Sequence, residues 1–262
     1  MRYNPMSNSC LFNTLYIQYV EDIGQNEYFS FDLKYPLIYN VQNGYFQVDN
    51  TILSNLNNTI SSSVYDFKDG IYEEEKQIND INPDGSKTKI NYKVFSNYDI
   101  TFNKNQVVSI VLSLMALDDN STQYSDLYSY NMDLLTGNQL SLKDIFKPNT
   151  DYLKLVSDFI NLKISQQPSF YYPNTSVNIP DDQSFYLTDK GIVIYFGLDE
   201  ISPAANGVPK FLMPFEDFQS YINPRFYCNI ANMNYNKNNN NERRFSSQHR
   251  RGYFSPQHKR YY

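Results

Sequence analysis

The longest mainly apolar segment of the chain is VVSIVLSLMAL, residues 107–117, and its length limits what the chain can fold into. Eleven residues suit a β-strand, whereas a membrane-spanning helix needs about 20 apolar residues. The first 20 residues also lack the charged region followed by an apolar stretch that marks a standard export signal. We therefore expect no membrane span and synthesis in the cytoplasm, with a core built from strands and short helices.

Apolar residues recur with two periods. Residues 28–38 alternate aromatic or aliphatic side chains with polar ones, as in a half-buried strand. Residues 48–64 instead place an aliphatic side chain at every fourth position, which predicts an amphipathic helix. Two more strands are expected at residues 92–102 and 107–117.

The second half repeats this mixture without obvious duplication. The elements expected there are a strand at 127–135, a helical turn at 141–146, a helix at 151–164, strands at 185–187, 192–198 and 208–213, and a helix from Pro214. Sheets and helices that do not alternate strictly predict the α+β class. We expect two small sheet-plus-helix domains, residues 8–120 and 121–224, followed by a tail at 225–262.

The composition of the tail differs from that of the rest. It is rich in Asn, Arg and Tyr and poor in aliphatic residues, so too little apolar surface is available to offset the entropy of ordering it. We expect it to be disordered. FSSQHRRGY (residues 245–253) is followed directly by FSPQHKRYY (residues 254–262), a tandem nonapeptide that indicates repeated weak contacts. The side chains expected to make these contacts or to be cross-linked are Arg243, Arg244, Arg250, Arg251, Tyr253, Lys259, Arg260, Tyr261 and Tyr262.

Charge is distributed unevenly along the chain. The formal net charge is −6, but residues 229–262 contain seven Lys or Arg and one acid, so the preceding chain carries −12. A basic and aromatic tail can contact nucleic acid, but the acidic body would repel it. We therefore favour acidic protein partners, including other copies of this chain.

Histidine is absent from the expected folded part, because His249 and His258 lie at equivalent positions of the two nonapeptides. Nucleophilic triads and the usual hydrolytic zinc sites, which need imidazole, are therefore excluded there. Neighbouring carboxylates remain as a possible glycosidase acid and base, at residues 73–75, 118–119, 181–182 and 199–200. Adjacent acids at loop edges are more often solvated charges, so we predict no catalytic residue, no metal site and no cofactor.

Two other motifs have ordinary explanations. DINPDG, residues 80–85, matches the start of a calcium loop, but Asn91 replaces the expected acid at the twelfth position and Lys87 adds a positive charge. We interpret it as a turn. Cys10 and Cys228 are far apart and form no CxxC pair. Whether they pair with each other stays open.

The segments that resemble a known family are YPLI at residue 35, the helix from residue 48, residues 91–117, YNMDLLTGNQLSLKDIF at residues 130–146, and residues 185–218. Together they resemble a DUF4163-type domain followed by a DUF3298 domain. This pair is the extracytoplasmic part of RsiV-type anti-sigma factors and is similar to the non-catalytic region of a PdaC-like peptidoglycan deacetylase. The resemblance implies that residues 199–207 connect two strands.

The sequence departs from this family in two ways. The family commonly has a Gly-Ala-His segment before the strand at residue 130, whereas this chain has tyrosines there. The candidate binding residues are Tyr124, Tyr128, Tyr130, Asp199 and Glu200. The chain also lacks the sigma-binding, membrane-spanning and deacetylase parts of the relatives, so we expect neither of their activities.

The favoured interpretation is a structural protein of the spore coat or spore surface, because such proteins are made in the cytoplasm and deposited without crossing a membrane. Its partners would be other coat proteins or copies of itself, joined through the body and the basic, tyrosine-rich tail. The alternative is a soluble RsiV-like module that binds lysozyme or a cell-wall fragment. A third class, a carboxylate-dependent wall hydrolase, is disfavoured.

Overall fold

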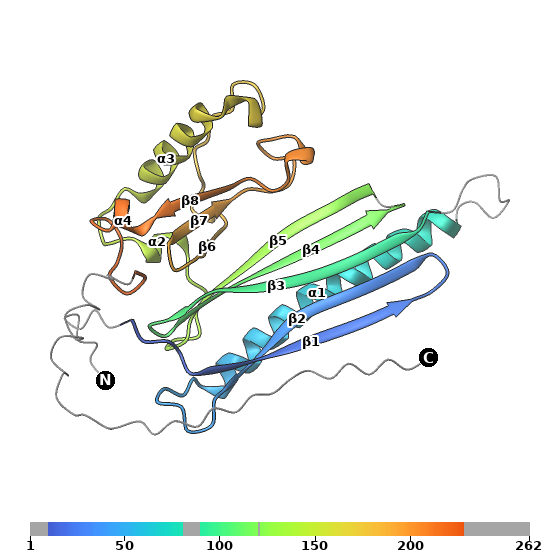
Figure 1. Ribbon diagram of the computed structural model, residues 1–262, viewed down its shortest axis with the longest axis horizontal. Helices are drawn as coiled ribbons and strands as arrows, with labels where there is room; N and C mark the ends of the chain where they lie inside the picture. Colours follow the sequence, from blue (N-terminus) through green and yellow to red (C-terminus); the bar gives the residue numbers. More distant parts are fainter. Residues whose placement is uncertain (1–9, 81–89, 120, 228–262) are drawn as a thin grey trace, which may run out of the picture. The chain divides into compact units, whose positions relative to one another are not determined.

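The computed structural model describes residues 10–80, 90–119 and 121–227 (Figure 1). The strands are β1 (Leu15–Gln25), β2 (Phe29–Asn40), β3 (Tyr92–Lys104), β4 (Val107–Asp118), β5 (Ser121–Asp133), β6 (Phe185–Leu187), β7 (Gly191–Tyr195) and β8 (Lys210–Pro214). The helices are α1 (Asn50–Asp80), α2 (Leu142–Ile145), α3 (Tyr152–Gln166) and α4 (Phe215–Phe218), with 3₁₀ turns η1 (Pro168–Phe170) and η2 (Ala204–Asn206). The mixture confirms the expected α+β class.

The first sheet has five strands in the order β1-β2-β3-β4-β5. Adjacent strands in this sheet are antiparallel except for β2 and β3. These two are parallel because α1 forms the crossover that connects them. Helix α1 runs along one face of this sheet (Figure 1). Aliphatic side chains of α1, including the buried Leu56, Ile60 and Val64, share a core with the alternate residues of β4. The four-residue stripe in the sequence is therefore the face that α1 buries.

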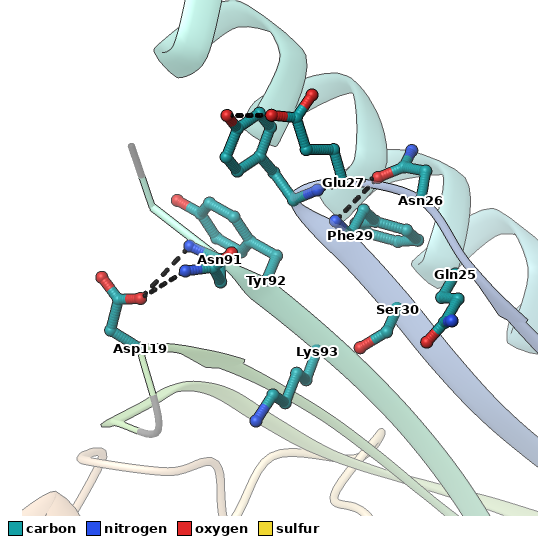
Figure 2. A pocket seen from close by; sticks show the side chains of 10 residues that line it. Gln25, Asn26, Glu27, Phe29, Ser30, Asn91, Tyr92, Lys93 and Asp119 are labelled. Carbon is teal, nitrogen blue, oxygen red and sulfur yellow. Dashed lines mark hydrogen bonds between the residues drawn. The ribbon is translucent and has the colours of Figure 1, made fainter. Parts of the chain in front are cut away.

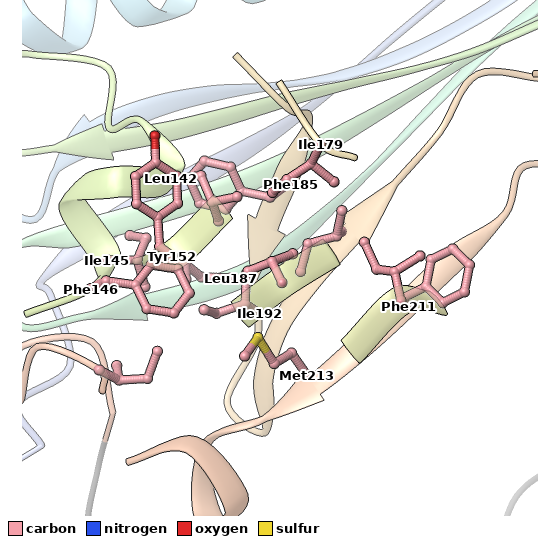
Figure 3. Close-up of a cluster of buried hydrophobic side chains, with 14 of the residues drawn as sticks. Leu142, Ile145, Phe146, Tyr152, Ile179, Phe185, Leu187, Ile192, Phe211 and Met213 are labelled. Atoms are coloured by element: carbon pink, nitrogen blue, oxygen red, sulfur yellow. The ribbon is translucent and has the colours of Figure 1, made fainter. Parts of the chain in front are cut away.

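The second sheet is an antiparallel meander of β6, β7 and β8. Figure 3 shows its core, where Leu142, Ile145 and Phe146 from the α2 region face Leu187 and Ile192 from the strands. Tyrosine 152 stacks on Phe146 with 5.7 Å between ring centroids. All five residues of β7 are buried, which explains why this strand reads as a continuous apolar run.

Buried polar groups join the two sheets. The Ser109 hydroxyl on β4 accepts a hydrogen bond from the Leu187 amide (3.1 Å) and donates one to Asn131 (2.7 Å). The Asn131 side chain in turn donates to the Phe185 carbonyl (2.8 Å). Both side chains are almost fully buried, so each of these groups needs its partner. The described residues belong to a single compact unit.

Several element boundaries expected from the sequence differ from the observed ones. The helix expected at residues 48–64 continues to Asp80. Strand β1 falls outside the expected strands, and β5 begins at Ser121, before the expected residue 127. Strands β4 and β5, on either side of residue 120, pair with each other in one sheet, and the division into two domains stays a prediction.

Some expectations concern residues at the edges of the described part. Helix α1 ends at Asp80, and the rest of DINPDG lies outside the described residues. Cys10 is disulfide-bonded, while Cys228, the other cysteine of the chain, lies outside them. The tail was expected to start at residue 225, yet Phe226 is only 2% exposed and belongs to the core of the second sheet. No described helix is long and apolar enough to cross a membrane.

Candidate functional site

The three candidate tyrosines lie on β5 but have different environments. Tyr124 is partly exposed and donates a hydrogen bond to Glu74 of α1 (2.9 Å). Tyr130 is buried and donates to Ser63 of α1 (2.8 Å). Hydroxyls held in this way fix β5 to the helix. Tyr128 is 43% exposed and lines a cleft, so it has the most accessible ring of the three.

Asp199 and Glu200 build the connection between β7 and β8. Asp199, which has a positive φ of 66°, accepts hydrogen bonds from the Tyr172 hydroxyl (2.5 Å) and the Ala204 amide (3.0 Å). Glu200 accepts one from the Gly197 amide (2.6 Å). Both carboxylates therefore satisfy groups of their own loop, as side chains in turns commonly do. Residues 199–207 connect two strands, as the resemblance implied.

The cleft beside Tyr128 has a volume of about 440 Å³. It lies between β5 and residues 181–185. Its lining is mainly polar and aromatic, and includes Tyr128, Ser129, Gln139, Asp181, Asp182, Gln183 and Tyr195. Hydroxyl, amide and carboxylate groups beside tyrosine rings can bind a polar ligand such as a sugar or a peptide.

Hydrogen bonds hold the walls of this cleft. The Tyr195 hydroxyl donates to Ser129 (3.1 Å), which links β7 to β5. Asp181 accepts from Tyr152 of α3 (2.7 Å), and this hydrogen bond, together with burial, raises the pKa of Tyr152 to about 12. Burial raises the pKa of Tyr195 as well. Both phenols therefore stay protonated near neutral pH and act as the hydrogen-bond donors that hold these walls.

A second pocket, of about 250 Å³, lies at the other end of the five-stranded sheet (Figure 2). The β1–β2 turn forms one wall, where Asn26 accepts a hydrogen bond from the Phe29 amide (2.8 Å). Asn91 and Asp119 form the other, and Asp119 accepts from the Asn91 backbone and side chain. Figure 2 shows these bonds within each wall, which indicates that the acid and amide groups close the strand ends.

A longer surface follows β1, and we define it as the β1 edge, Leu15–Gln25. None of its 11 residues is buried, and Tyr16, Tyr19 and Ile23 are 57%, 53% and 67% exposed. On β1 itself, the Tyr19 hydroxyl donates to Glu21 (3.0 Å). Among the described residues, β1 pairs on one side only, with β2. Sequence reasoning missed this surface, although its Tyr, Ile and Val content is typical of a strand.

The remaining candidate sites are the acidic pair at residues 118–119, possible metal ligands and the tail. Asp118 accepts a hydrogen bond from Gln123 (2.7 Å), so it is engaged at the strand ends like Asp119. Within residues 10–80, 90–119 and 121–227, no group of three or more His, Cys, Asp or Glu is placed to hold a metal ion. The tail residues predicted to bind or to be cross-linked lie outside the described residues.

The last described residues of the chain lie near the start of β1. Arg225 forms a bidentate ion pair with Asp133 of β5 (2.6 and 2.7 Å) and donates to the carbonyls of Asn105 and Gln106 in the β3–β4 turn. Asn105 in turn exchanges backbone and side-chain hydrogen bonds with Leu11, four residues before β1. The last described residues are therefore anchored at the end of the sheet where β1 starts.

Comparisons with known proteins agree with this architecture. The family model described as "Protein of unknown function (DUF3298)" matches residues 143–216, and the model described as "Deacetylase PdaC" matches residues 24–116. A DUF3298-family crystal structure from Bacteroides fragilis NCTC 9343 has a TM-score of 0.59 at 15% identity, covering 81% of this chain and 95% of that one. One from Pseudomonas aeruginosa PAO1 has a TM-score of 0.51 at 12% identity, covering 82% and 96%.

These similarities establish the fold and not an activity, since both identities are low. No curated protein matches the sequence. The expected relation to DUF4163 and to RsiV-type anti-sigma factors is not shown by these matches and stays a prediction. The chain contains a DUF3298 domain, preceded by a region similar to the PdaC family model.

Proposed function

We propose that this protein works by contact and not by turnover, as a structural component of a spore coat or spore surface that assembles with other coat proteins and with copies of itself. The observation that carries the proposal is the β1 edge, a long exposed strand on an acidic body whose tail is basic and aromatic. An open strand edge can pair with another chain, and opposite charges on one molecule favour association between copies. The 25 tyrosines of the chain supply further contact area.

Truncation after Arg244, which removes both nonapeptides, tests this proposal. The full chain is expected to sediment as larger species as its concentration rises in about 50 mM salt, while the truncated chain stays smaller. In a sporulating culture the full chain should be found in purified spores and the truncated chain should be depleted from them. A full chain that is monomeric at every concentration and missing from spores would refute the proposal.

A second candidate function is binding of lysozyme or a cell-wall fragment, and the cleft beside Tyr128 favours it. This function needs the body and not the tail. Calorimetric titration with lysozyme and with muropeptides would then show saturable binding to the chain truncated after Arg244. A Tyr128→Ala change should weaken that binding, whereas Tyr221→Ala, at a similarly exposed tyrosine outside the cleft, should leave it unchanged.

The non-catalytic part of the proposal has its own test. The acids at residues 118–119 and 199–200 hold strand ends and turns, and Asp181 holds Tyr152, so these carboxylates have structural partners. Purified full chain is therefore expected to release neither acetate nor sugar from peptidoglycan. Turnover that an Asp181→Asn change abolishes would contradict this.

A further inference from the structure

The β1 edge selects against pairing with itself. It carries Glu21 and Asp22 and no basic residue. Lys34 on the neighbouring β2 pairs with Asp32 (2.7 Å) and reaches Glu21 (3.7 Å), so one cation faces two carboxylates, while Asp22 accepts a hydrogen bond from Tyr65 of α1 (2.9 Å). Two β1 strands brought together would oppose like charges, which is destabilising. A basic strand would not meet this repulsion.

The surrounding body has the same sign. Described residues 10–133, which form the five-stranded sheet and α1, contain 16 acidic residues and five lysines. The remaining described residues, 134–227, contain ten acidic and seven basic residues. The negative charge is therefore concentrated in the half of the body that carries the β1 edge, and it attracts a basic segment to that half.

The tail repeats have the pattern and the length of a matching strand. In an extended chain alternate residues share a face, so Phe, His, Arg and Tyr lie together in both nonapeptides, at residues 245, 249, 251 and 253 and again at 254, 258, 260 and 262. Nine residues fit along the 11 residues of β1. Pro256 lacks an amide hydrogen, which is tolerated where a strand becomes the new edge of a sheet.

The chain between body and repeats is long enough to reach another molecule. Arg225 fixes the end of the described chain beside the start of β1, and residues 228–244 separate it from the first repeat. These 17 residues span up to about 55 Å when extended, against roughly 36 Å for the length of β1. A single β1 holds one repeat, so the two repeats of a tail need two copies of β1.

From these observations we infer that β1 accepts one nonapeptide repeat from the tail of a neighbouring copy as an added β-strand. The inference rests on the proposed function and names the acceptor surface of the assembly. Main-chain hydrogen bonds to the open edge hold the added strand, while its Arg and Lys side chains meet the acids of β1 and its Phe and Tyr rings pack on Tyr16, Tyr19 and Ile23. Each copy then offers one acceptor and two donor repeats, which links copies into an extended array.

Two full-length variants with the same added charge test the inference. Ile23→Lys places a cation on the β1 edge, whereas Leu162→Lys places one on α3, at a residue 56% exposed against 67% for Ile23. Sedimentation of the full chain should show that Ile23→Lys lowers the association constant about tenfold, because an apolar cross-strand contact is lost and like charges oppose. Leu162→Lys should associate like the wild type. Circular dichroism and thermal unfolding check that both variants fold.

The outcomes separate the inference from the proposed function. If the chain truncated after Arg244 stops associating while Ile23→Lys associates like Leu162→Lys, the tail docks elsewhere and only the inference fails. If the truncated chain associates as well as the full chain, or the full chain is always monomeric, both fail.

If Ile23→Lys unfolds, a second experiment replaces the test with this variant: a fluorescent peptide of residues 245–262 is titrated into the truncated chain. Both cores lie within residues 10–227 and remain in that chain. Excess unlabelled peptide of residues 15–25 should then compete for the labelled peptide, and failure to compete refutes the inference.

Discussion

Replacing Arg225 by methionine is expected to lower the free energy of unfolding by about 3 kcal/mol at pH 7. The side chains of Arg225 and Asp133 are only 17% and 11% exposed and form a bidentate pair. Removal of one partner from a buried ion pair costs about 3–5 kcal/mol, since the other charge is left buried without compensation. Because both side chains keep a small exposed fraction, we expect a loss of stability at the lower end of this range. Methionine retains most of the apolar packing of the arginine stem.

The loss should depend on pH in a defined direction. Burial raises the pKa of Asp133, but the hydrogen bond from Arg225, with others from the backbone, outweighs burial and lowers it. The wild-type pair therefore stabilises the fold fully above the unfolded pKa, near 4, and loses this contribution as the pH falls through the folded pKa. In the Arg225→Met variant, the buried carboxylate of Asp133 has no cation beside it, so its charge destabilises the fold at pH 7. Protonation of Asp133 on acidification removes that charge and its cost. The difference between the two proteins should shrink between pH 7 and about pH 3.

Urea unfolding at pH 7 and at pH 3.5, followed by circular dichroism, measures both effects. The double variant Asp133→Asn with Arg225→Met is the control, because it removes both charges and should be more stable at pH 7 than Arg225→Met alone. A loss below about 1 kcal/mol, or an equal loss at the two pH values, would show that the ion pair does not anchor this end of the chain.

Two glycines and one asparagine give further stability predictions. Gly191→Ala should destabilise the fold by roughly 1–3 kcal/mol, because the new Cβ would lie 2.2 Å from the Met213 carbonyl oxygen. Gly70→Ala should stabilise it by up to about 1 kcal/mol, because Gly70 lies in exposed helix and a Cβ there would meet nothing within 4 Å. Thermal unfolding that shifts both variants in the same direction would contradict this. Asn57→Ala should cost about 3 kcal/mol, because the buried Ile38 amide and carbonyl both lose their partner. Urea unfolding measures this cost, and a change within 0.5 kcal/mol, as for an ordinary surface substitution, would argue against it.

The sequence predicts best the elements that are buried. Strand β4 was predicted from a continuous apolar run of strand length, and the first half of α1 from an apolar side chain at every fourth position. Both signals exist because these residues are packed in a core. Strand β1 has no buried residue, so nothing in its composition had to alternate. Strand β5 begins with polar residues whose pairing with β4 depends on backbone hydrogen bonds. Both missed segments are edge strands, where the periodic signal is weakest.

The candidate sites show the same limit at longer range. Arg225 and Asp133 are 92 residues apart in the sequence, and no local sequence pattern predicts that they form an ion pair. Asp199 and Glu200 were candidates because an acidic pair interrupts an apolar run, yet their carboxylates satisfy backbone amides of the turn. A polar residue in a loop carries the same sequence signal whether it binds its own backbone or a ligand. Only the fold distinguishes the two.

Charge and strand pairing supply different parts of the proposed assembly, and neither suffices alone. Attraction between the acidic sheet half and the basic tail brings copies together, but exposed charges are screened within about 10 Å in 0.1 M salt and do not fix one register. Main-chain hydrogen bonds along β1 fix register, but an open edge without charge would also accept its own kind and aggregate. Glu21 and Asp22 exclude a second β1, while the alternating aromatic and basic residues of the repeats suit the strand. The specificity of the proposed pairing therefore depends on both partners. The negative charge of the β1 edge repels a second β1 strand and attracts the basic repeat.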